Sequence, residues 1–290
     1  VVGVLPMLHV DIEDEDSLTE RFRKKSRSGL AKIAVIRLPR ISNFTDIAPL
    51  EAVDELDVSY VSNISQFGDP DVVIIPGSKN TISDLLWMRQ NGLEGKILRH
   101  AAKGGIVFGI CGGYQMLGQS ISDPTGAEQK GTVRGMGLLP VTTVFEQEKR
   151  RTRVSGRFAK VGGALAEMSG VCYEGYEIHM GRTVLSKGTV PLVYMEEEGE
   201  QRQDGAQSDH VYGCYMHGIF DMSETVKTFL AAVLRKKGID PSKITVRDRN
   251  AYKEEQYDRL ASIVRENLNM EAVYKIIEKG NEASCSLLSE

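Results

Sequence analysis

The sequence predicts an α/β fold, in which an open and mostly parallel sheet with flanking helices is joined to an antiparallel portion. Between residues 32 and 110, short runs rich in Val and Ile alternate with stretches that carry apolar residues at helical spacing. This alternation is typical of a parallel sheet with crossover helices. From about residue 130 to 220, strand-like segments are separated by glycines, which indicates antiparallel strands.

Four apolar runs make up the predicted parallel strands, and the first three are closed by Pro, Gly or polar residues, as expected of strands buried on both faces. Helices are expected between them, with starts at Thr45 and Ser78 and a stop at Gly104 and Gly105. A further helix is expected to end at Gly238. The strand segments are KIAVIRLP (32–39), LDVSYV (56–61), DVVIIPG (71–77) and IVFGI (106–110).

Composition and charge are those of an ordinary globular protein. Of 290 residues, 41% are hydrophobic and 26% are charged, which is enough for a sizeable core. The net charge of −4 gives no reason to expect a nucleic-acid or membrane partner. No apolar run approaches the roughly 20 residues of a membrane span. The four cysteines lack a paired pattern, which favours free thiols and a cytoplasmic location. The sequence does not indicate an oligomeric state.

Three segments are expected along the chain. Residues 1–28 contain an acidic block followed by a basic one, and we expect the tail of an upstream domain plus its linker there. Residues 29–238 hold the α/β domain. Residues 239–290 predict one or two polar amphipathic helices and a frayed tail, NEASCSLLSE.

The segment IVFGICGGYQMLG places Cys111 between a buried strand and a helix. Gly109 and Gly113 flank it as in the G-x-nucleophile-x-G turn of hydrolases, with Cys in place of Ser. Such a turn strains the central residue and requires small neighbours. The thiol is expected to reach open space at the carboxyl edge of the sheet, beside the positive end of the helix, where the N–H of Gly112 faces the same space. The alternative is a structural cysteine packed beneath a Gly-rich turn.

A thiol nucleophile needs a base, and His217 fits this role best among the five histidines. It ends an apolar strand and precedes Gly218, which places the imidazole at a strand edge. His179 lies in similar sequence, and a structural role is an equal alternative for it. The others are expected in the tail, at a solvated helix end and at the surface: His9, His100 and His210.

A zinc site is an alternative role for Cys172, His179, Cys214 and His217. If residues 212–217 form one strand, Cys214 and His217 point to opposite faces and cannot share an ion. The spacing also differs from that of zinc fingers. No metal site is therefore expected in this chain.

Four separated motifs point to one family: IPGSKNTISDL, GICGGYQMLG, GYEIHMGRT and YGCYMHGIFD. Over about residues 30–238 the chain resembles the glutamine amidotransferase domain of the cobyric acid synthases, in the CobQ/CobB branch of the triad amidotransferases. The resemblance implies the class I amidotransferase fold, which is flavodoxin-like. It also implies an enzyme that hydrolyses glutamine and supplies ammonia for ATP-dependent amidation of corrinoid carboxylates in cobalamin biosynthesis.

The first residues, GVLPMLHVDIEDEDS, resemble the end of the ATP-dependent synthetase domain that precedes the amidotransferase domain in this family. ATP and Mg are therefore expected in that upstream domain, and no cofactor is expected in this chain. No G-x-x-x-x-G-K-[ST] pattern occurs in the sequence. The implied partners are glutamine and, through the upstream domain, a corrinoid.

The resemblance also implies catalytic roles. Cys111 would attack the glutamine amide and form a γ-glutamyl thioester, while His217 would pass the proton to ammonia and then activate water. Many triad amidotransferases carry a Glu two residues after this His, where the present chain has Ile219. The CobQ/CobB branch similarly lacks this Glu. Asp221 and Glu177 are therefore candidates for the group that orients the imidazole.

Binding roles follow from the same resemblance. The N–H groups of Gly112 and Gly77 would form the oxyanion hole. Gln115 matches a position that helps to bind glutamine. Tyr176 and His179 would border the glutamine pocket, on weaker grounds.

Several alternatives stay open at this point. A related ligase, either cobyrinic acid a,c-diamide synthase or an amidotransferase of a cell-wall lipid precursor, would share most of these motifs. A domain of the same fold that only binds a ligand or partner would lack the thiol chemistry. A cysteine hydrolase unrelated to glutamine is a third alternative.

Overall fold

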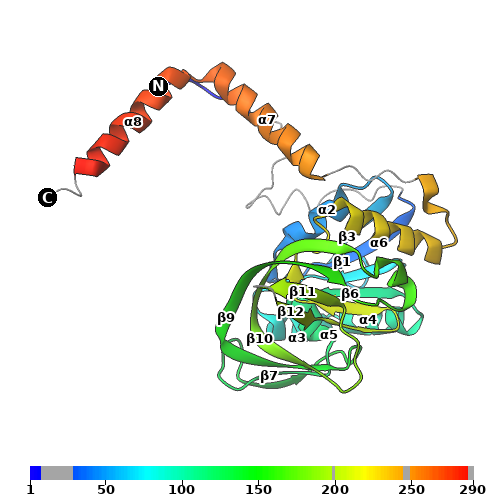
Figure 1. Cartoon of the computed structure of the whole chain (residues 1–290). Coiled ribbons are helices and arrows are strands. Elements are labelled where there is room, and N and C mark those ends of the chain that lie inside the picture. The colour runs from blue at the N-terminus through cyan, green and yellow to red at the C-terminus, as the bar shows by residue number, and fades with distance from the viewer. Residues whose placement is uncertain (8–28, 198–199, 244–248, 287–290) are drawn as a thin grey trace. The chain divides into compact units, whose positions relative to one another are not determined.

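The computed structural model describes residues 1–7, 29–197, 200–243 and 249–286, and its contacts divide the chain into two compact units (Figure 1). The larger unit spans Leu18–Arg247, and the smaller one combines Val1–Ser17 with Asp248–Glu290. The expected domain boundaries at residues 28 and 238 stay predictions. Most of the expected linker, with His9, lies outside the described residues.

The larger unit is built on a sheet to which the described residues contribute six strands, in the order β13-β14-β6-β4-β1-β3. All neighbours are parallel except β13, which pairs antiparallel at one edge. Numbered along the chain, the parallel strands follow the order 2-1-3-4-5 of flavodoxin-like sheets, so the predicted fold class is confirmed. The bounds are β1 Ala31–Ile36, β3 Leu56–Val61, β4 Val72–Ile75, β6 Ile106–Ile110, β13 Ala206–Ser208 and β14 Val211–Cys214.

Helices cover both faces of this sheet (Figure 1). α2 contacts α6, whereas α3 contacts α4 and α5. This two-sided cover explains why every residue of β4 and β6 is buried. The α-helices are α2 Ala48–Glu51, α3 Thr81–Gln90, α4 Leu93–Ala102, α5 Gly112–Leu117 and α6 Ser223–Lys236, and the 3-10 helices are η1 Phe44–Ile47, η2 Gly163–Met168 and η3 Pro241–Lys243.

Both predicted helix starts are wrong by a few residues. The helical segment near Thr45 begins after Asn43, whose φ of 50° turns the chain into η1. α3 is capped by Asn80 rather than Ser78, because the Asn80 side chain accepts the N–H of Ser83 at 3.0 Å. The predicted stops are better placed, since positive φ values at Gly104 and Gly238 follow the ends of α4 and α6.

The antiparallel portion is a second sheet, to which the described residues contribute seven strands. Five of them follow the order β12-β11-β9-β10-β15, while β7 pairs with β8 and, in parallel, with β9. A separate small pair joins β2 to β5. The bounds are β2 Ile41–Ser42, β5 Gly77–Ser78, β7 Ser120–Asp123, β8 Gly131–Arg134, β9 Val141–Phe158, β10 Cys172–Leu185, β11 Val193–Glu197, β12 Glu200–Asp204 and β15 Met216–His217.

The assumption that residues 212–217 form one strand is wrong. β14 ends at Cys214 in the first sheet, and β15 begins at Met216 in the second. Between them, the Tyr215 N–H donates to the Asp204 carboxylate at 2.8 Å instead of joining a ladder. The face alternation used against zinc therefore does not hold. In the described part of the chain, no three His, Cys, Asp or Glu side chains are grouped so that they could hold a metal ion.

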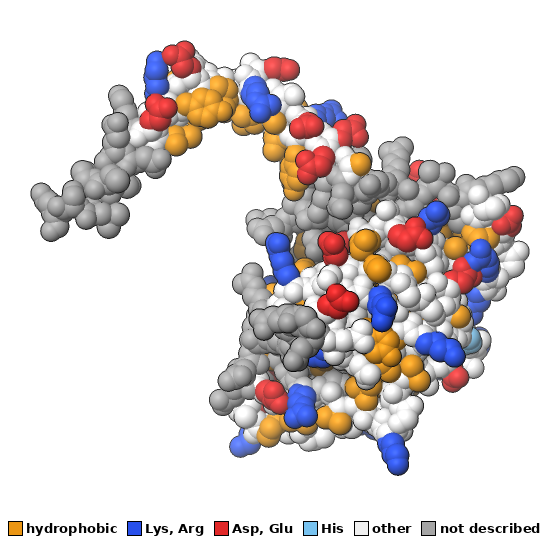
Figure 2. All heavy atoms as spheres, viewed as in Figure 1, with side chains coloured by type: hydrophobic (Ala, Val, Ile, Leu, Met, Phe, Trp, Pro, Cys, Tyr) orange, Lys and Arg blue, Asp and Glu red, His pale blue; other side chains and the backbone are white. Residues whose placement is uncertain are grey.

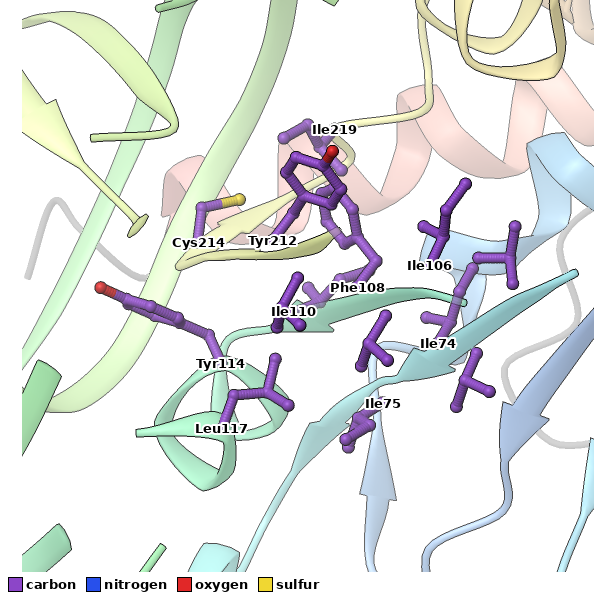
Figure 3. Packing of buried hydrophobic residues seen from close by; sticks show 14 of the residues in the cluster. Ile74, Ile75, Ile106, Phe108, Ile110, Tyr114, Leu117, Tyr212, Cys214 and Ile219 are labelled. Atoms are coloured by element: carbon purple, nitrogen blue, oxygen red, sulfur yellow. The ribbon is translucent and has the colours of Figure 1, made fainter. Parts of the chain in front are cut away.

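The core of the larger unit lies around β6 and β14 (Figure 3). Phe108 packs against Phe220 and Tyr212, with ring centroids 5.5 and 6.5 Å apart. Tyr114 and Leu117 extend from α5 into the same cluster, so the helix after Cys111 is anchored by apolar burial. Each such side chain contributes about 1.5–3 kcal/mol of stability.

The smaller unit contains α7 Arg249–Asn267 and α8 Met270–Ser286. These are the helices expected after residue 239, although α8 continues into the segment predicted to be a frayed tail. Gly3 forms an antiparallel bridge with Leu268, and the Asn269 N–H donates to the Val2 carbonyl at 2.7 Å. No helix of the described residues has both the length and the apolar character needed to cross a membrane.

Candidate active site

Cys111 lies at a strained turn between β6 and α5. Its φ of 52° and ψ of −110° are unusual for a residue with a side chain. The turn is held from both sides, because the Cys111 N–H donates to the Cys214 carbonyl at 2.8 Å and the Gln115 N–H donates to the Cys111 carbonyl at 3.1 Å. The predicted elbow is confirmed.

The flanking glycines are required by close backbone contacts. A Cβ on Gly113 would lie 2.0 Å from the carbonyl oxygen of Ile75, and one on Gly109 would lie 2.8 Å from the Gly113 carbonyl carbon. Neither position has room for a methyl group. The G-x-Cys-x-G spacing is therefore a steric requirement of the turn.

The thiol does not reach open space as expected, because the second sheet covers it. Cys111 is only 7% exposed, and its Sγ donates to the Ile178 carbonyl of β10 at 3.5 Å. Strand β10 of the antiparallel sheet thus covers Cys111 at the carboxyl edge of the parallel sheet. The Cys111 sulfur lies between the two sheets.

His217 is placed beside this sulfur by β15, which pairs with β10 opposite Tyr176. The two rings stack with centroids 5.2 Å apart at 24°. On another side, a Cβ on Gly77 would lie 3.2 Å from Cε1 of His217. The ring is 1% exposed and is therefore held in one orientation.

Asp46 binds the inner nitrogen of this imidazole. Its Oδ2 lies 2.7 Å from Nδ1 of His217, and its Oδ1 accepts the Gly218 N–H at 2.8 Å. Asp46 belongs to η1 and is 2% exposed. It fixes the ring so that Nε2 is the nitrogen available for proton transfer.

The sequence candidates for this orienting role are wrong. Asp221 and Glu177 were the candidates, yet it is Asp46 that contacts Nδ1. Glu177 instead pairs with Arg202. Asp46 lies 171 positions before His217 in the chain, so only the fold brings them together. An aspartate in an otherwise apolar helix start is a weak signal that could have drawn attention to it.

The charge of Asp46 changes the titration of the ring. Burial alone would lower the pKa of His217, but the hydrogen bond and charge of Asp46, with a further contribution from the Cys111 sulfur, raise it to about 10. Among the described residues, Nε2 makes no hydrogen bond of ordinary geometry. Cys111 is the neighbour whose sulfur adds to the rise in the pKa of the ring. At neutral pH the ring is protonated.

The two residues predicted to supply the oxyanion hole, Gly112 and Gly77, belong to segments that contact each other. A Cβ on Gly112 would lie 3.0 Å from the Ser78 nitrogen and 3.1 Å from Oγ1 of Thr81. The turn that contains Gly77 therefore faces the first residue of α5. The use of both N–H groups as an oxyanion hole stays a prediction.

A family model for the CobB/CobQ-like glutamine amidotransferase domain matches residues 32–225 of this chain. This match includes Cys111, His217 and Asp46 and covers more than half of the sequence. The chain belongs to the CobB/CobQ-like glutamine amidotransferase family. It is accordingly a glutamine amidotransferase.

Curated relatives of this CobB/CobQ-like domain bear the name cobyric acid synthase. The protein from Ruminiclostridium cellulolyticum is 54% identical over 97% of this chain and 56% of its own length. Those from Lachnoclostridium phytofermentans and Alkaliphilus metalliredigens are 45% and 44% identical over 96% of this chain, and over 56% and 57% of their own lengths. The chain thus spans about half the length of these relatives.

Solved structures support the fold of the CobB/CobQ-like domain. A chain of the PurLQS structure from Thermotoga maritima matches with a TM-score of 0.53 at 18% identity, covering 71% of this chain and 99% of that one. A crystal structure of a glutamine amidotransferase matches with a TM-score of 0.50 at 16% identity over the same shares. At these identities the likeness concerns the fold alone.

Gln115, a predicted glutamine contact of this CobB/CobQ-like domain, is 2% exposed. Its side chain forms hydrogen bonds within the protein. Its Oε1 accepts from Thr81 at 3.2 Å, and its Nε2 donates to the Met180 carbonyl at 3.1 Å and to the Tyr215 hydroxyl at 3.0 Å. It therefore joins α3, α5 and β10 beside the reacting cysteine. Direct contact with glutamine stays a prediction.

Tyr176 and His179 lie on different sides of β10. Tyr176 stacks on His217, which places it at the active site. His179 stacks on Tyr215 with centroids 3.7 Å apart, and its Nδ1 lies 3.0 Å from the Gly181 carbonyl. His179 and Tyr215 also line a cavity of about 320 Å³. Their glutamine-binding roles stay predictions.

Neither of the other two described histidines serves this site. His100 is half-buried, and its Nε2 lies 3.1 Å from the Ile106 carbonyl, so the expected solvated position is wrong. Burial lowers its pKa. His210 accepts the Ala164 N–H at 3.2 Å.

Proposed function

We propose that this chain is the glutamine-hydrolysing part of a cobyric acid synthase, which uses ammonia from glutamine to amidate corrinoid carboxylates at the expense of ATP. Support comes from the family membership and from relatives of that name at 44–54% identity. The observation that carries the hydrolytic half is the Asp46–His217 contact beside the elbow cysteine.

In the first half-reaction, the Cys111 sulfur attacks the carbonyl carbon of the glutamine side-chain amide. A C–S bond forms, and the carbonyl electron pair moves to the oxygen, which the N–H groups of Gly112 and Gly77 would stabilise. The C–N bond then breaks as His217 gives its proton to the leaving nitrogen. Ammonia departs, and a γ-glutamyl thioester remains on the sulfur.

In the second half-reaction, His217 acts as the base. Its neutral Nε2 takes a proton from water, and the hydroxyl adds to the thioester carbon. The C–S bond breaks, and glutamate is released. Asp46 supports both steps, since it keeps Nδ1 protonated and stabilises the imidazolium whenever it forms.

Glutamine can reach Cys111 only if the contact between the sulfur and β10 changes. The sulfur is bonded to the Ile178 carbonyl and is largely covered, so the substrate amide must replace this contact. We infer that β10 bounds the glutamine pocket and moves relative to Cys111 when glutamine binds. The stacking of Tyr176 on His217 supports a position of the tyrosine ring at the same boundary.

We assign the ATP-dependent amidation to the part of the full-length relatives that lies outside the match with this chain. We expect ATP and Mg, as well as the corrinoid, to bind there, because the chain spans 56% of the first relative. The described cysteines 111, 172 and 214 are free thiols, which supports a cytoplasmic location.

The test measures ammonia release from glutamine by the chain alone and after addition of the unmatched N-terminal segment of the Ruminiclostridium cellulolyticum relative. We expect slow release alone and faster release with that segment, ATP and a corrinoid carboxylate, with amidated corrinoid detected by mass spectrometry. Amidation of only the a- and c-carboxylates, or of a lipid precursor, would favour the related ligases. A failure of diazo-oxo-norleucine to label Cys111 would favour a binding domain without catalysis.

A further inference from the structure

The helices of the smaller unit carry exposed apolar side chains (Figure 2). On α8, Tyr274, Ile276 and Ile277 are exposed by 57%, 62% and 55%. Together with half-buried Val273, they occupy neighbouring positions of one helical face. Single exposed apolar residues are ordinary, but a contiguous group indicates a surface that binds another body. This group is called the α8 face.

The start of the chain is part of the same body. Gly3 bridges Leu268 at the junction of α7 and α8, and the Val2 carbonyl accepts the Asn269 N–H at 2.7 Å. A Cβ on Gly3 would lie 2.1 Å from the Asn267 carbonyl oxygen, so the two backbones are in close contact. Segments at opposite ends of the sequence thus form one unit, and the whole amidotransferase domain lies between them in the chain.

The full-length relatives contain a further segment that the smaller unit could contact. The match covers 56% of each of the first two relatives and corresponds to their C-terminal part, so about 44% of each lies outside it and precedes the matched region. In such a protein that segment reaches the position of Val1, next to the α7–α8 junction. Its local concentration at the α8 face is therefore high, in the millimolar range for a short connection, and a modest apolar area is enough to bind it.

We propose that the α8 face packs against the segment that precedes the matched region in the full-length relatives. α7, α8 and the first residues of this chain then complete the upstream domain, and the amidotransferase domain is an insertion between two parts of that body. Two connections rather than one hold the glutaminase against its partner. This assignment concerns an interface and does not depend on which carboxylate is amidated.

The test joins the unmatched N-terminal segment of the Ruminiclostridium cellulolyticum relative to Val1 of this chain and measures hydrogen–deuterium exchange. We expect amides of α8 to exchange about 10-fold more slowly in the joined protein than in the 290-residue chain. The variant Ile276→Lys/Ile277→Lys should lose this protection, because Lys keeps the helix but removes the apolar contact. Tyr274→Lys is a second variant in case the first disturbs α8.

The matched control is Val184→Lys, which changes a residue of β10 that is 51% exposed and should leave the protection intact. Equal exchange of α8 in the joined and unjoined proteins would overturn the proposal. Dimerisation of the 290-residue chain that is lost in Ile276→Lys/Ile277→Lys would also overturn it, since a second copy would then be the occupant. Glutamine hydrolysis is followed in parallel, so that loss of activity with retained protection counts only against the proposed function.

Discussion

His179, in β10, and His217, in the neighbouring strand β15, resemble each other in three respects. Each is mostly covered, each stacks on a tyrosine, and each has a carboxylate nearby. His217 stacks on Tyr176 at 5.2 Å, and His179 stacks on Tyr215 at 3.7 Å. What separates them is the state of the neighbouring carboxylate and the partner of Nδ1.

The Asp46 carboxylate forms hydrogen bonds with His217 and with one backbone N–H, that of Gly218. Glu177, in contrast, is paired with Arg202 and lies 3.7 Å from His179, whose Nδ1 faces a carbonyl instead. A carboxylate already neutralised by a guanidinium has little charge to offer an imidazolium. Burial, stacking and an acid nearby are therefore insufficient, and a base also needs a carboxylate that is committed to it.

The largest expected effect is at the Cys111 sulfur, which contributes to the raised pKa of His217. Cys111→Ser should reduce glutamine hydrolysis by about 10³-fold or more, because a hydroxyl is a far weaker nucleophile at neutral pH. Circular dichroism should show an unchanged fold. Ammonia release is the measurement, and its persistence in this variant would end the assignment of the nucleophile.

Cys214→Ser is the matched control for that change. Cys214 is fully buried in the core, where a hydroxyl costs stability without touching the reaction (Figure 3). We expect a lower melting temperature and the native rate per folded molecule.

Replacing each ring in turn tests the comparison directly. His217→Gln should lower kcat by about 10²–10⁴-fold, the usual contribution of a general base. His179→Gln should leave kcat nearly unchanged and raise KM if this side of β10 borders the glutamine pocket. A loss of kcat in both variants would show that the two sites do not differ as described.

The carboxylates form a second matched pair. Asp46→Asn should lower kcat by about 10²–10⁴-fold, since its amide N–H would hold Nδ1 as an acceptor and leave the proton on Nε2. Glu177→Gln should change kcat by less than about 10-fold, because this group is bonded to Arg202. Steady-state kinetics on the two variants distinguishes them, and equal losses would contradict the role of Asp46.

The variant Asp46→Asn is also expected to change how the stability of the folded protein depends on pH. The pKa of His217 is raised in the folded state to about 10, so its stabilisation is complete below the ordinary value near 6.5 and is lost as pH rises through about 10. The destabilisation caused by Asp46→Asn should therefore be greatest near pH 6 and decline towards pH 10. Urea unfolding at several pH values measures it.

The sequence was sufficient for features that depend on neighbouring residues. The strained turn at Cys111 follows from the two glycines, and the parallel strands follow from short β-branched runs. Asp46 could not be found in this way, because its partner lies 171 positions away and is reached only through the second sheet. The break at Tyr215 was missed for a related reason, since its backbone N–H is taken by Asp204.

Asp204 is a third case for the comparison, because it is a buried carboxylate whose desolvation is not fully offset by its partners. Burial and the charge of Glu177 raise its pKa to about 6, although backbone hydrogen bonds and Arg202 act in the opposite direction. Between about pH 4 and pH 6 the folded protein holds a proton that the unfolded chain releases. Ionising Asp204 then costs up to about 3 kcal/mol of stability as pH rises through this window.

Asp204→Asn should remove this cost while keeping an oxygen that accepts the Tyr215 N–H. Other carboxylates titrate in the same window, so the informative quantity is the difference in unfolding free energy between variant and native protein. We expect this difference to shift in favour of the variant by up to about 3 kcal/mol between pH 4 and pH 7. A difference that stays flat across this range would mean that Arg202 neutralises Asp204 as it does Glu177.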